Sequence, residues 1–159
     1  MTFGDWVWEV LALRHRPQYG LAHGALLCLW LGLYLGALSS RVAWGAGAGA
    51  IVGFAAAASY YALRPLVGYL AMLVAWIGLW FGLAWLTQHL LAGRVSPRQA
   101  LLRAVLAGAG SGAAFYAVSG IWMNPPSEYV YAWHFPAWTI AFLPGSLALL
   151  CCLPKGSRD

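Results

Sequence analysis

Charged side chains are scarce in this 159-residue chain. Lys, Arg, Asp and Glu together make up 8% of it, while 62% of its residues are hydrophobic. A soluble domain carries about 25% charged residues, so a water-facing surface built from this sequence would be one continuous apolar patch. This excludes a water-soluble fold. We predict an all-α integral membrane protein whose main partner is the lipid bilayer.

Acidic residues are the rarest class, and only Asp5, Glu9, Glu128 and Asp159 carry a carboxylate side chain. Nine Lys and Arg residues outweigh them and give a net charge of +5. The basic residues lie at the ends of apolar runs and do not form one basic face. Nucleic-acid binding is therefore excluded, and contact with membrane headgroups is favoured.

Cysteine and metal-ligand patterns are also sparse. Cys28 lies inside an apolar run and Cys151 and Cys152 are adjacent, so no disulfide framework is predicted. The histidines are His15, His23, His89 and His134, and no His-x-x-x-His or Cys-x-x-Cys spacing supports a metal site. Nor does a nucleophile lie near a base in the sequence, since Ser111 follows a glycine run without one. Enzyme activity is therefore not favoured but is left open, and no cofactor is assigned.

Long apolar runs dominate what the sequence does contain. Five of them reach the length of about 20 residues that a membrane-spanning helix needs: 20–40, 43–63, 66–92, 98–121 and 135–153. Residues 3–14 are too short to cross but carry tryptophans that suit the headgroup layer, so 1–17 is predicted to form an interfacial amphipathic helix. The predicted organisation is this segment, a five-helix transmembrane domain over 18–154 and a polar tail over 155–159.

Short polar segments separate the runs. Ser39-Ser40-Arg41 and Arg64-Pro65 predict tight turns, and Ser96-Pro97 predicts an N-cap followed by proline at the first helical position. Five spans place three basic residues on one side of the membrane and six on the other. The richer side holds Arg41, Arg94, Arg98, Arg103, Lys155 and Arg158. By the positive-inside rule this favours a cytoplasmic C-terminus, in a bacterial inner membrane.

Glycines recur four residues apart on several runs. The sets are Gly32 and Gly36, Gly45, Gly49 and Gly53, Gly78 and Gly82, and Gly108 and Gly112. Such faces let helix backbones approach closely, and they also offer a surface to another membrane protein or a second copy of this chain. The segment 30–36 matches 76–82, and 58–62 matches 113–117, so parallel two-helix repeats are one interpretation. Chance similarity in an apolar alphabet is the other.

Aromatic residues on the first and third runs lie opposite these glycines. Trp30 and Tyr34, and likewise Trp76 and Trp80, are displaced from the glycines by two residues, or about 200° of helical rotation. If the glycine sides make the helix contacts, the aromatic sides face either lipid or an internal cavity.

The stretch from Trp122 to Trp138 gathers an amide, a carboxylate, a histidine and three prolines between two long runs. Asn124-Pro125-Pro126 predicts a stiff turn, because two prolines fix two φ angles. Glu128 is either a solvated loop residue or a carboxyl group that carries a proton or pairs with a cationic ligand. His23 and His134 begin two parallel runs, so they are either interfacial polar groups or ligands of a haem b iron between the helices.

One family likeness lies in the same stretch. Trp122-Met-Asn-Pro-Pro126, followed by Phe135-Pro-Ala-Trp-Thr139, resembles a signature of the tryptophan-rich sensory, or translocator, proteins. The resemblance implies a small five-helix membrane protein from a family whose members bind porphyrins and sterol-like ligands. It covers fewer than twenty residues, and in that family the motif links the first two helices, whereas here it precedes the last. The family's activity is therefore not assigned to this chain.

The leading hypothesis is a protein that binds or transports a small apolar or amphipathic molecule in an aromatic-lined, outward-opening cavity. The predicted ligand contacts are Trp30, Tyr34, Trp76, Trp80, Trp122, Asn124, Glu128, Tyr131, His134 and Trp138. A second hypothesis is a non-catalytic subunit of a larger respiratory, photosynthetic or transport complex. A third is a haem b-binding membrane protein.

Overall fold

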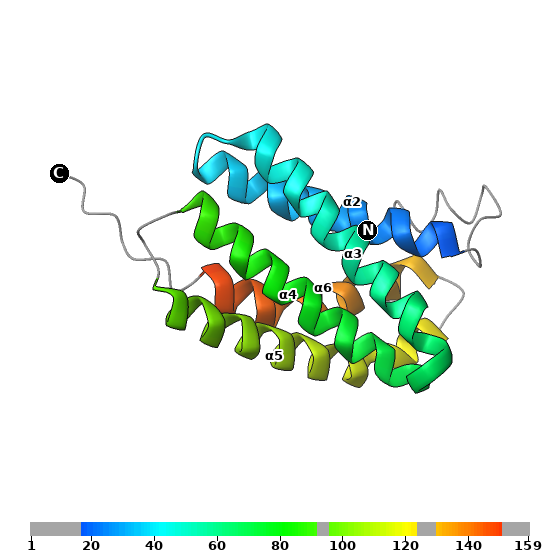
Figure 1. The fold of residues 1–159 in the computed structure, drawn as a ribbon. Coiled ribbons are helices and arrows are strands. Elements are labelled where there is room, and N and C mark those ends of the chain that lie inside the picture. Colours follow the sequence, from blue (N-terminus) through cyan, green and yellow to red (C-terminus); the bar gives the residue numbers. More distant parts are fainter. Residues whose placement is uncertain (1–16, 92–95, 124–129, 151–159) are drawn as a thin grey trace.

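A computed structural model describes residues 17–91, 96–123 and 130–150, and these ranges are helical throughout apart from short turns (Figure 1). The α-helices are α2 (Pro17–Leu38), α3 (Val42–Val67), α4 (Ala71–Leu90), α5 (Pro97–Met123) and α6 (Val130–Leu150). A short 3-10 helix, η1 (Gly68–Leu70), joins α3 to α4. The all-α prediction is confirmed for this part of the chain. The predicted interfacial helix, apart from Pro17, and the polar tail lie outside the described residues.

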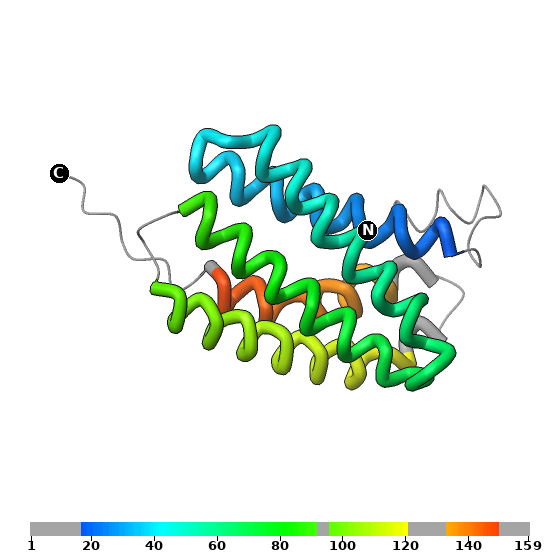
Figure 2. The backbone as a smooth tube through the Cα atoms, in the orientation of Figure 1, coloured from blue at the N-terminus to red at the C-terminus, as the bar shows by residue number. Residues whose placement is uncertain are grey.

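Three helical stretches are long and apolar enough to cross a membrane: Pro17–Leu38, Val42–Leu90 and Pro97–Gly120. The second contains both α3 and α4, which fold back on each other and run side by side (Figure 2). Large apolar side chains cover the outside of the helices, with Trp30 69% exposed, Ile51 71% and Leu66 79%. Such a surface suits lipid better than water. The described helices are thus compatible with a multi-pass membrane protein.

Two of the predicted boundaries follow from local hydrogen bonding. The Ser96 Oγ accepts a hydrogen bond from the Gln99 amide at 3.3 Å, and the Ser96 amide donates to Gln99 Oε1 at 3.3 Å. This reciprocal pair is a capping box, and it starts α5 at Pro97 as predicted. At the other boundary the Arg41 amide donates to the Gly36 carbonyl at 2.8 Å, which closes the predicted turn after α2.

The turn predicted at Arg64-Pro65 is wrong, because Pro65 lies inside α3 and the chain reverses three residues later. Gly68 has a φ of 60°, and its amide donates to the Arg64 carbonyl to end the helix. A left-handed φ suits glycine, whereas proline is held near −65°, so the reversal forms where the glycine is. The last helix also differs from its predicted range, since it begins at Val130 and not at residue 135.

The α2 and α3 helices pack backbone against backbone along their glycines. A Cβ added at Gly24 would lie 2.7 Å from the Gly53 carbonyl oxygen, and one added at Gly45 would lie 2.7 Å from the Gly36 Cα. No side chain fits between the two helices at these positions, so dispersion between backbones holds them together. The glycine spacing on these two runs therefore predicted a real helix contact. We call α2 and α3 the glycine hairpin.

The α4 helix is central and packs against α2, α3, α5 and α6. Its large side chains are accordingly buried, with Trp76 5% exposed and Trp80 1%. Its glycines do not repeat the role of those in α2. A Cβ added at Gly78 would have no described atom within 4 Å, and one at Gly82 would meet Val52. The matching segments 30–36 and 76–82 therefore occupy different environments, and their likeness does not extend to packing.

Candidate functional site

A cavity of about 360 Å³ lies between the glycine hairpin and the α4, α5 and α6 helices. It is located at the end of the bundle where α2 begins and α3 ends, and each of the described α-helices contributes to its lining. No Asp, Glu, Lys or Arg lines it within the described ranges. Its walls are aromatic rings and aliphatic groups, with a few polar tips.

One wall of the cavity is a contiguous set of aromatic rings from α4, α5 and α6. The Trp76 ring centroid lies 4.8 Å from that of Phe142 and 5.4 Å from that of Phe115, and Trp138 lies 6.1 Å from Phe142. The ring planes are tilted by 47° to 56° in these pairs. These are favourable distances and orientations for aromatic quadrupoles, so the rings hold one another in place. We call Trp76, Phe115, Trp138 and Phe142 the aromatic wall.

Tyrosines gather at the end of the cavity that lies nearest the ends of the helices. The rings of Tyr60 and Tyr61 meet edge to face at 5.1 Å, and Tyr69 joins them from η1. Tyr19 contributes a further ring from the first turn of α2. We call these four the tyrosine rim. Because each ring ends in a hydroxyl group, the rim offers hydrogen bonds, whereas the aromatic wall is mainly an apolar surface.

Part of the hairpin side of the cavity is lined by glycine and alanine and not by large side chains. Gly24 and Gly53 meet backbone to backbone there, and Ala56 and Ala57 continue the surface along α3. Methyl groups and backbone cannot reach across to the aromatic wall. The same residues that bring α2 and α3 together therefore leave a hollow beside them.

The predicted tryptophans divide between the cavity, the core and the outer surface. Trp76 and Trp138 line the cavity. Trp80 stacks on Trp76 at 6.4 Å but lies behind it, packed against Gly145 of α6. Trp30 is 69% exposed and faces away from the cavity, because α2 lies at the edge of the bundle whereas α4 lies at its centre.

The other predicted ligand contacts either lie away from the cavity or fall outside the described residues. Tyr34 is 54% exposed on α2, and His134 is 5% exposed but is not part of the lining. Asn124 and Glu128 lie outside the described residues, as do the side chains of Trp122 and Tyr131. Their roles stay predictions.

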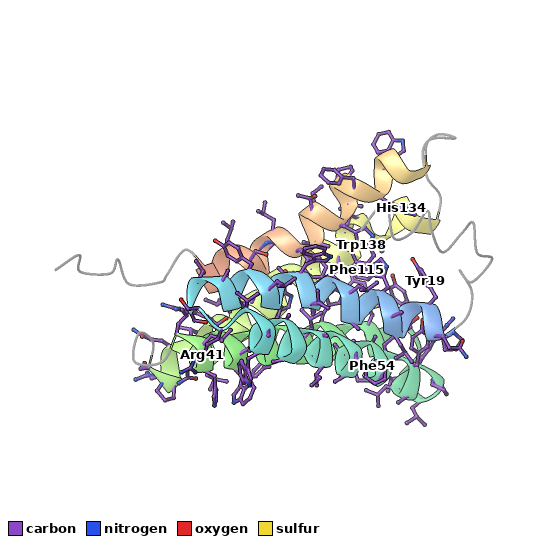
Figure 3. The ribbon with its side chains drawn as sticks, turned by 90° about the horizontal axis from the view of Figure 1, so that it is seen from above. Tyr19, Arg41, Phe54, Phe115, His134 and Trp138 are labelled. Atoms are coloured by element: carbon purple, nitrogen blue, oxygen red, sulfur yellow. The ribbon has the colours of Figure 1, made fainter. Side chains whose placement is uncertain are left out.

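The structure does not bring His23 and His134 to one cavity. His23 lines it from α2, whereas His134 is buried away from it on α6, beyond Trp138 (Figure 3). A haem iron held by both imidazoles would require them to face one shared space. Within the described residues no group of three His, Cys, Asp or Glu side chains could hold a metal ion either. The arrangement therefore does not fit haem b between these two residues.

Sequence reasoning missed the tyrosine rim and half of the aromatic wall. The sequence marks three of these residues only as members of the matching segments 58–62 and 113–117, namely Tyr60, Tyr61 and Phe115. Their usable signal was position, since each follows a Gly/Ala-rich stretch and is close to the same end of its helix. Phe142 had a different signal, because it follows Trp138 by four residues as Trp80 follows Trp76.

Ser111, the buried hydroxyl without a base near it in sequence, has a structural role. It is fully buried in α5, and its Oγ accepts a hydrogen bond from the Gly145 amide of α6 at 2.9 Å. Beside this contact, a Cβ added at Gly110 would lie 3.1 Å from the Pro144 ring. Ser111 and Gly110 thus let α5 pack closely against Pro144 and Gly145 of α6.

Two smaller spaces, of about 10 and 20 Å³, have no more room than about one water molecule needs. The larger cavity is therefore the candidate site.

No protein-family model, curated protein or solved structure matches this chain.

Proposed function

We propose that this chain is a five-span membrane protein that binds or transports a small apolar or amphipathic molecule in the cavity. The observation that supports this is the cavity itself, about 360 Å³ in volume with a preformed aromatic wall. Small-molecule sites in proteins commonly have volumes of about 300–1,000 Å³ and are lined mainly by apolar groups.

The lining also indicates how such a molecule would be oriented. A flat apolar body would pack against Trp76, Trp138 and Phe142, where each ring contact is worth about 0.5–1.5 kcal/mol beyond the area buried. A hydroxyl or carbonyl group would reach the tyrosine rim, where hydroxyls such as those of Tyr60 and Tyr61 offer hydrogen bonds. Because no Asp, Glu, Lys or Arg lines the described cavity, an anionic ligand would lose its hydration there without gaining an ion pair.

In this proposal the helices α2 to α6 are the five spans, with the cavity near the outer surface of a bacterial inner membrane. Arg41, Arg98 and Arg103 lie at or near the opposite ends of their helices from the cavity, whereas Arg64 lies at the cavity end. This distribution supports a cytoplasmic location for the Arg41 end and the C-terminus.

The test compares two tryptophans that the sequence places in matching segments. Trp76→Ala removes the middle of the aromatic wall, while Trp30→Ala removes a ring that is exposed on the outer surface. Each variant is purified in mild detergent, co-purified small molecules are identified by mass spectrometry, and binding of pyrene, a flat apolar probe, is measured by fluorescence. Loss of one ring contact worth about 1.4 kcal/mol lowers affinity about tenfold, so we expect that loss for Trp76→Ala and no change for Trp30→Ala.

A third variant separates loss of the binding site from loss of the fold. Met72→Trp adds bulk to the cavity while keeping the aromatic wall, and it should also weaken pyrene binding. The proposal fails if wild-type protein carries no small molecule and binds no pyrene. It also fails if all three variants bind pyrene as the wild type does.

A subunit of a larger membrane complex is the second candidate, and open glycines favour it. A Cβ added at Gly47 or Gly78 would have no described atom within 4 Å, so each of these glycines faces outward from its helix. Another helix could pack closely there, from a different protein or from a second copy of this chain. Affinity purification in mild detergent distinguishes the candidates. A stoichiometric membrane partner supports the subunit function, and a monodisperse single species contradicts it.

A further inference from the structure

The cavity is bounded on one side by two helices, α2 and α6, that do not pack closely on each other. Among the described residues α2 packs on α3, α6 packs on α5, and both contact α4. His23 and Leu27 of α2 and Trp138 and Phe142 of α6 nevertheless all line the cavity. The rings of His23 and Trp138 meet across the gap with centroids 5.6 Å apart. We call these four residues the α2–α6 seam; Figure 3 shows α6 diverging from α2 toward the end that carries Tyr19.

Other sides of the cavity are closed more firmly. Between α2 and α3 the backbones touch, and a Cβ added at Gly24 would lie 2.7 Å from the Gly53 carbonyl oxygen. On the side of η1 and α5, the Tyr116 hydroxyl donates a hydrogen bond to the Tyr69 carbonyl at 3.1 Å, and their rings meet at 5.3 Å. Opening either side requires moving a helix or breaking a hydrogen bond. At the seam, rotation of the His23 side chain about χ1 and χ2 would be enough to part its ring from that of Trp138, which the aromatic wall holds in place.

The seam also faces the medium in which an apolar ligand is concentrated. Tyr19, His23 and Leu27 on α2 are only partly buried, as are Trp138 and Phe142 on α6. Neighbouring large side chains on these helices are exposed and apolar, with Leu26 of α2 48% exposed and Leu143 of α6 50% exposed. In the five-span arrangement this side of the molecule borders lipid chains.

We propose that the ligand enters and leaves the cavity sideways from the bilayer through the α2–α6 seam, with His23 and Trp138 as the two halves of a side-chain gate. The ligand class is a flat, uncharged ring molecule that partitions into lipid and carries one hydrogen-bonding group. Its ring slides between His23 and Trp138 onto the aromatic wall, and its polar group turns toward the tyrosine rim. This inference rests on the proposed function, because it assigns a route and a ligand class to the same cavity.

A reversible bridge across the seam tests the route. In a variant whose three native cysteines are replaced, His23→Cys and Trp138→Cys form the seam pair. Tyr34→Cys and Ser146→Cys form a control pair, because these residues border one small space at the other end of the same two helices. Each pair is bridged with a bis-methanethiosulfonate reagent in lipid nanodiscs. The rate at which bound pyrene escapes into excess lipid vesicles is then measured before bridging, after bridging and after reduction.

Each variant serves as its own reference, so the loss of the native side chains does not confuse the result. We expect the bridged seam pair to release pyrene at least about tenfold more slowly, which corresponds to about 1.4 kcal/mol in the barrier. Reduction should restore the original rate, and bridging the control pair should leave it unchanged. If the seam pair fails to hold pyrene before bridging, His23→Ala replaces it, and removal of one half of the gate should speed release about tenfold.

Failure of the route is distinguishable from failure of the proposed function. Wild-type protein that binds no pyrene contradicts the function. Protein that binds pyrene, but releases it at the same rate with the seam open or bridged, contradicts only the lateral route. Equal slowing by the seam and control bridges also contradicts it, because the seam would then have no special role.

Discussion

The glycine hairpin makes a prediction that depends on a single methyl group. A Cβ added at Gly49 would lie 2.9 Å from the Gly32 Cα and closer still to the Cys28 carbonyl oxygen. Carbon atoms prefer separations of about 3.5–4.0 Å, so Gly49→Ala forces α2 and α3 apart by about 0.6–1.1 Å. Overpacking of this kind typically costs about 1–3 kcal/mol. We expect the free energy of unfolding of Gly49→Ala to fall by about that amount.

Gly47→Ala is the matched control, two residues away on the same helix. A Cβ added at Gly47 would have no described atom within 4 Å, so no contact opposes the new methyl group. Alanine is favoured over glycine inside a helix by up to about 1 kcal/mol, so this variant should be neutral or slightly more stable. Unfolding in mixed micelles of increasing dodecyl sulfate content, followed by circular dichroism, measures both. If Gly49→Ala is as stable as Gly47→Ala, the backbone packing of α2 and α3 is not what holds the hairpin together.

Three further predictions follow from the structure. Ser111→Ala removes the acceptor for the Gly145 amide and should lower the free energy of unfolding by about 1–2 kcal/mol in the same titration. An unchanged free energy would show that this hydrogen bond contributes nothing. Cys28 is fully buried between α2 and α3. In a variant whose two C-terminal cysteines are replaced, its thiol should resist maleimide while the protein is folded and should react once dodecyl sulfate unfolds it. Fast labelling of the folded protein would contradict the close packing of the hairpin. The proposed orientation places η1 outside the cell membrane. In intact cells, a membrane-impermeant maleimide should therefore label Leu70→Cys directly and Arg41→Cys only after permeabilisation. The reverse pattern would refute that orientation.

Local chemistry explains which parts of the fold could be predicted from the sequence. The capping box of Ser96 and Gln99 needs only residues three apart, and it starts α5 where the sequence placed it. The glycine spacing on α2 and α3 requires only that two neighbouring helices meet on their smallest faces. Sequence alone predicts the chain reversal at Pro65, because proline is the stronger turn signal. The reversal forms at Gly68, whose left-handed φ is visible only in the structure.

The candidate site was harder to predict because burial depends on how many neighbours a helix has. Trp30 and Trp76 lie in nearly the same local sequence, yet one is 69% exposed and the other 5%. The difference arises because α4 is surrounded by four helices, whereas α2 lies at the edge of the bundle. Periodicity alone reports which side of a helix is aromatic but not what that side faces.

The position of the cavity follows from an asymmetry between the two halves of the bundle. In the hairpin, glycine and alanine bring backbones together and leave part of the cavity wall without long side chains, as at Gly53 and Ala57. Among α4, α5 and α6, large rings such as Trp76 and Phe142 hold one another in a fixed wall. A smooth surface opposite a rigid aromatic surface cannot interdigitate, and the unfilled volume collects between them. A larger side chain at Ala56, which lines the cavity from the hairpin side, should therefore fill part of the cavity without disturbing the wall.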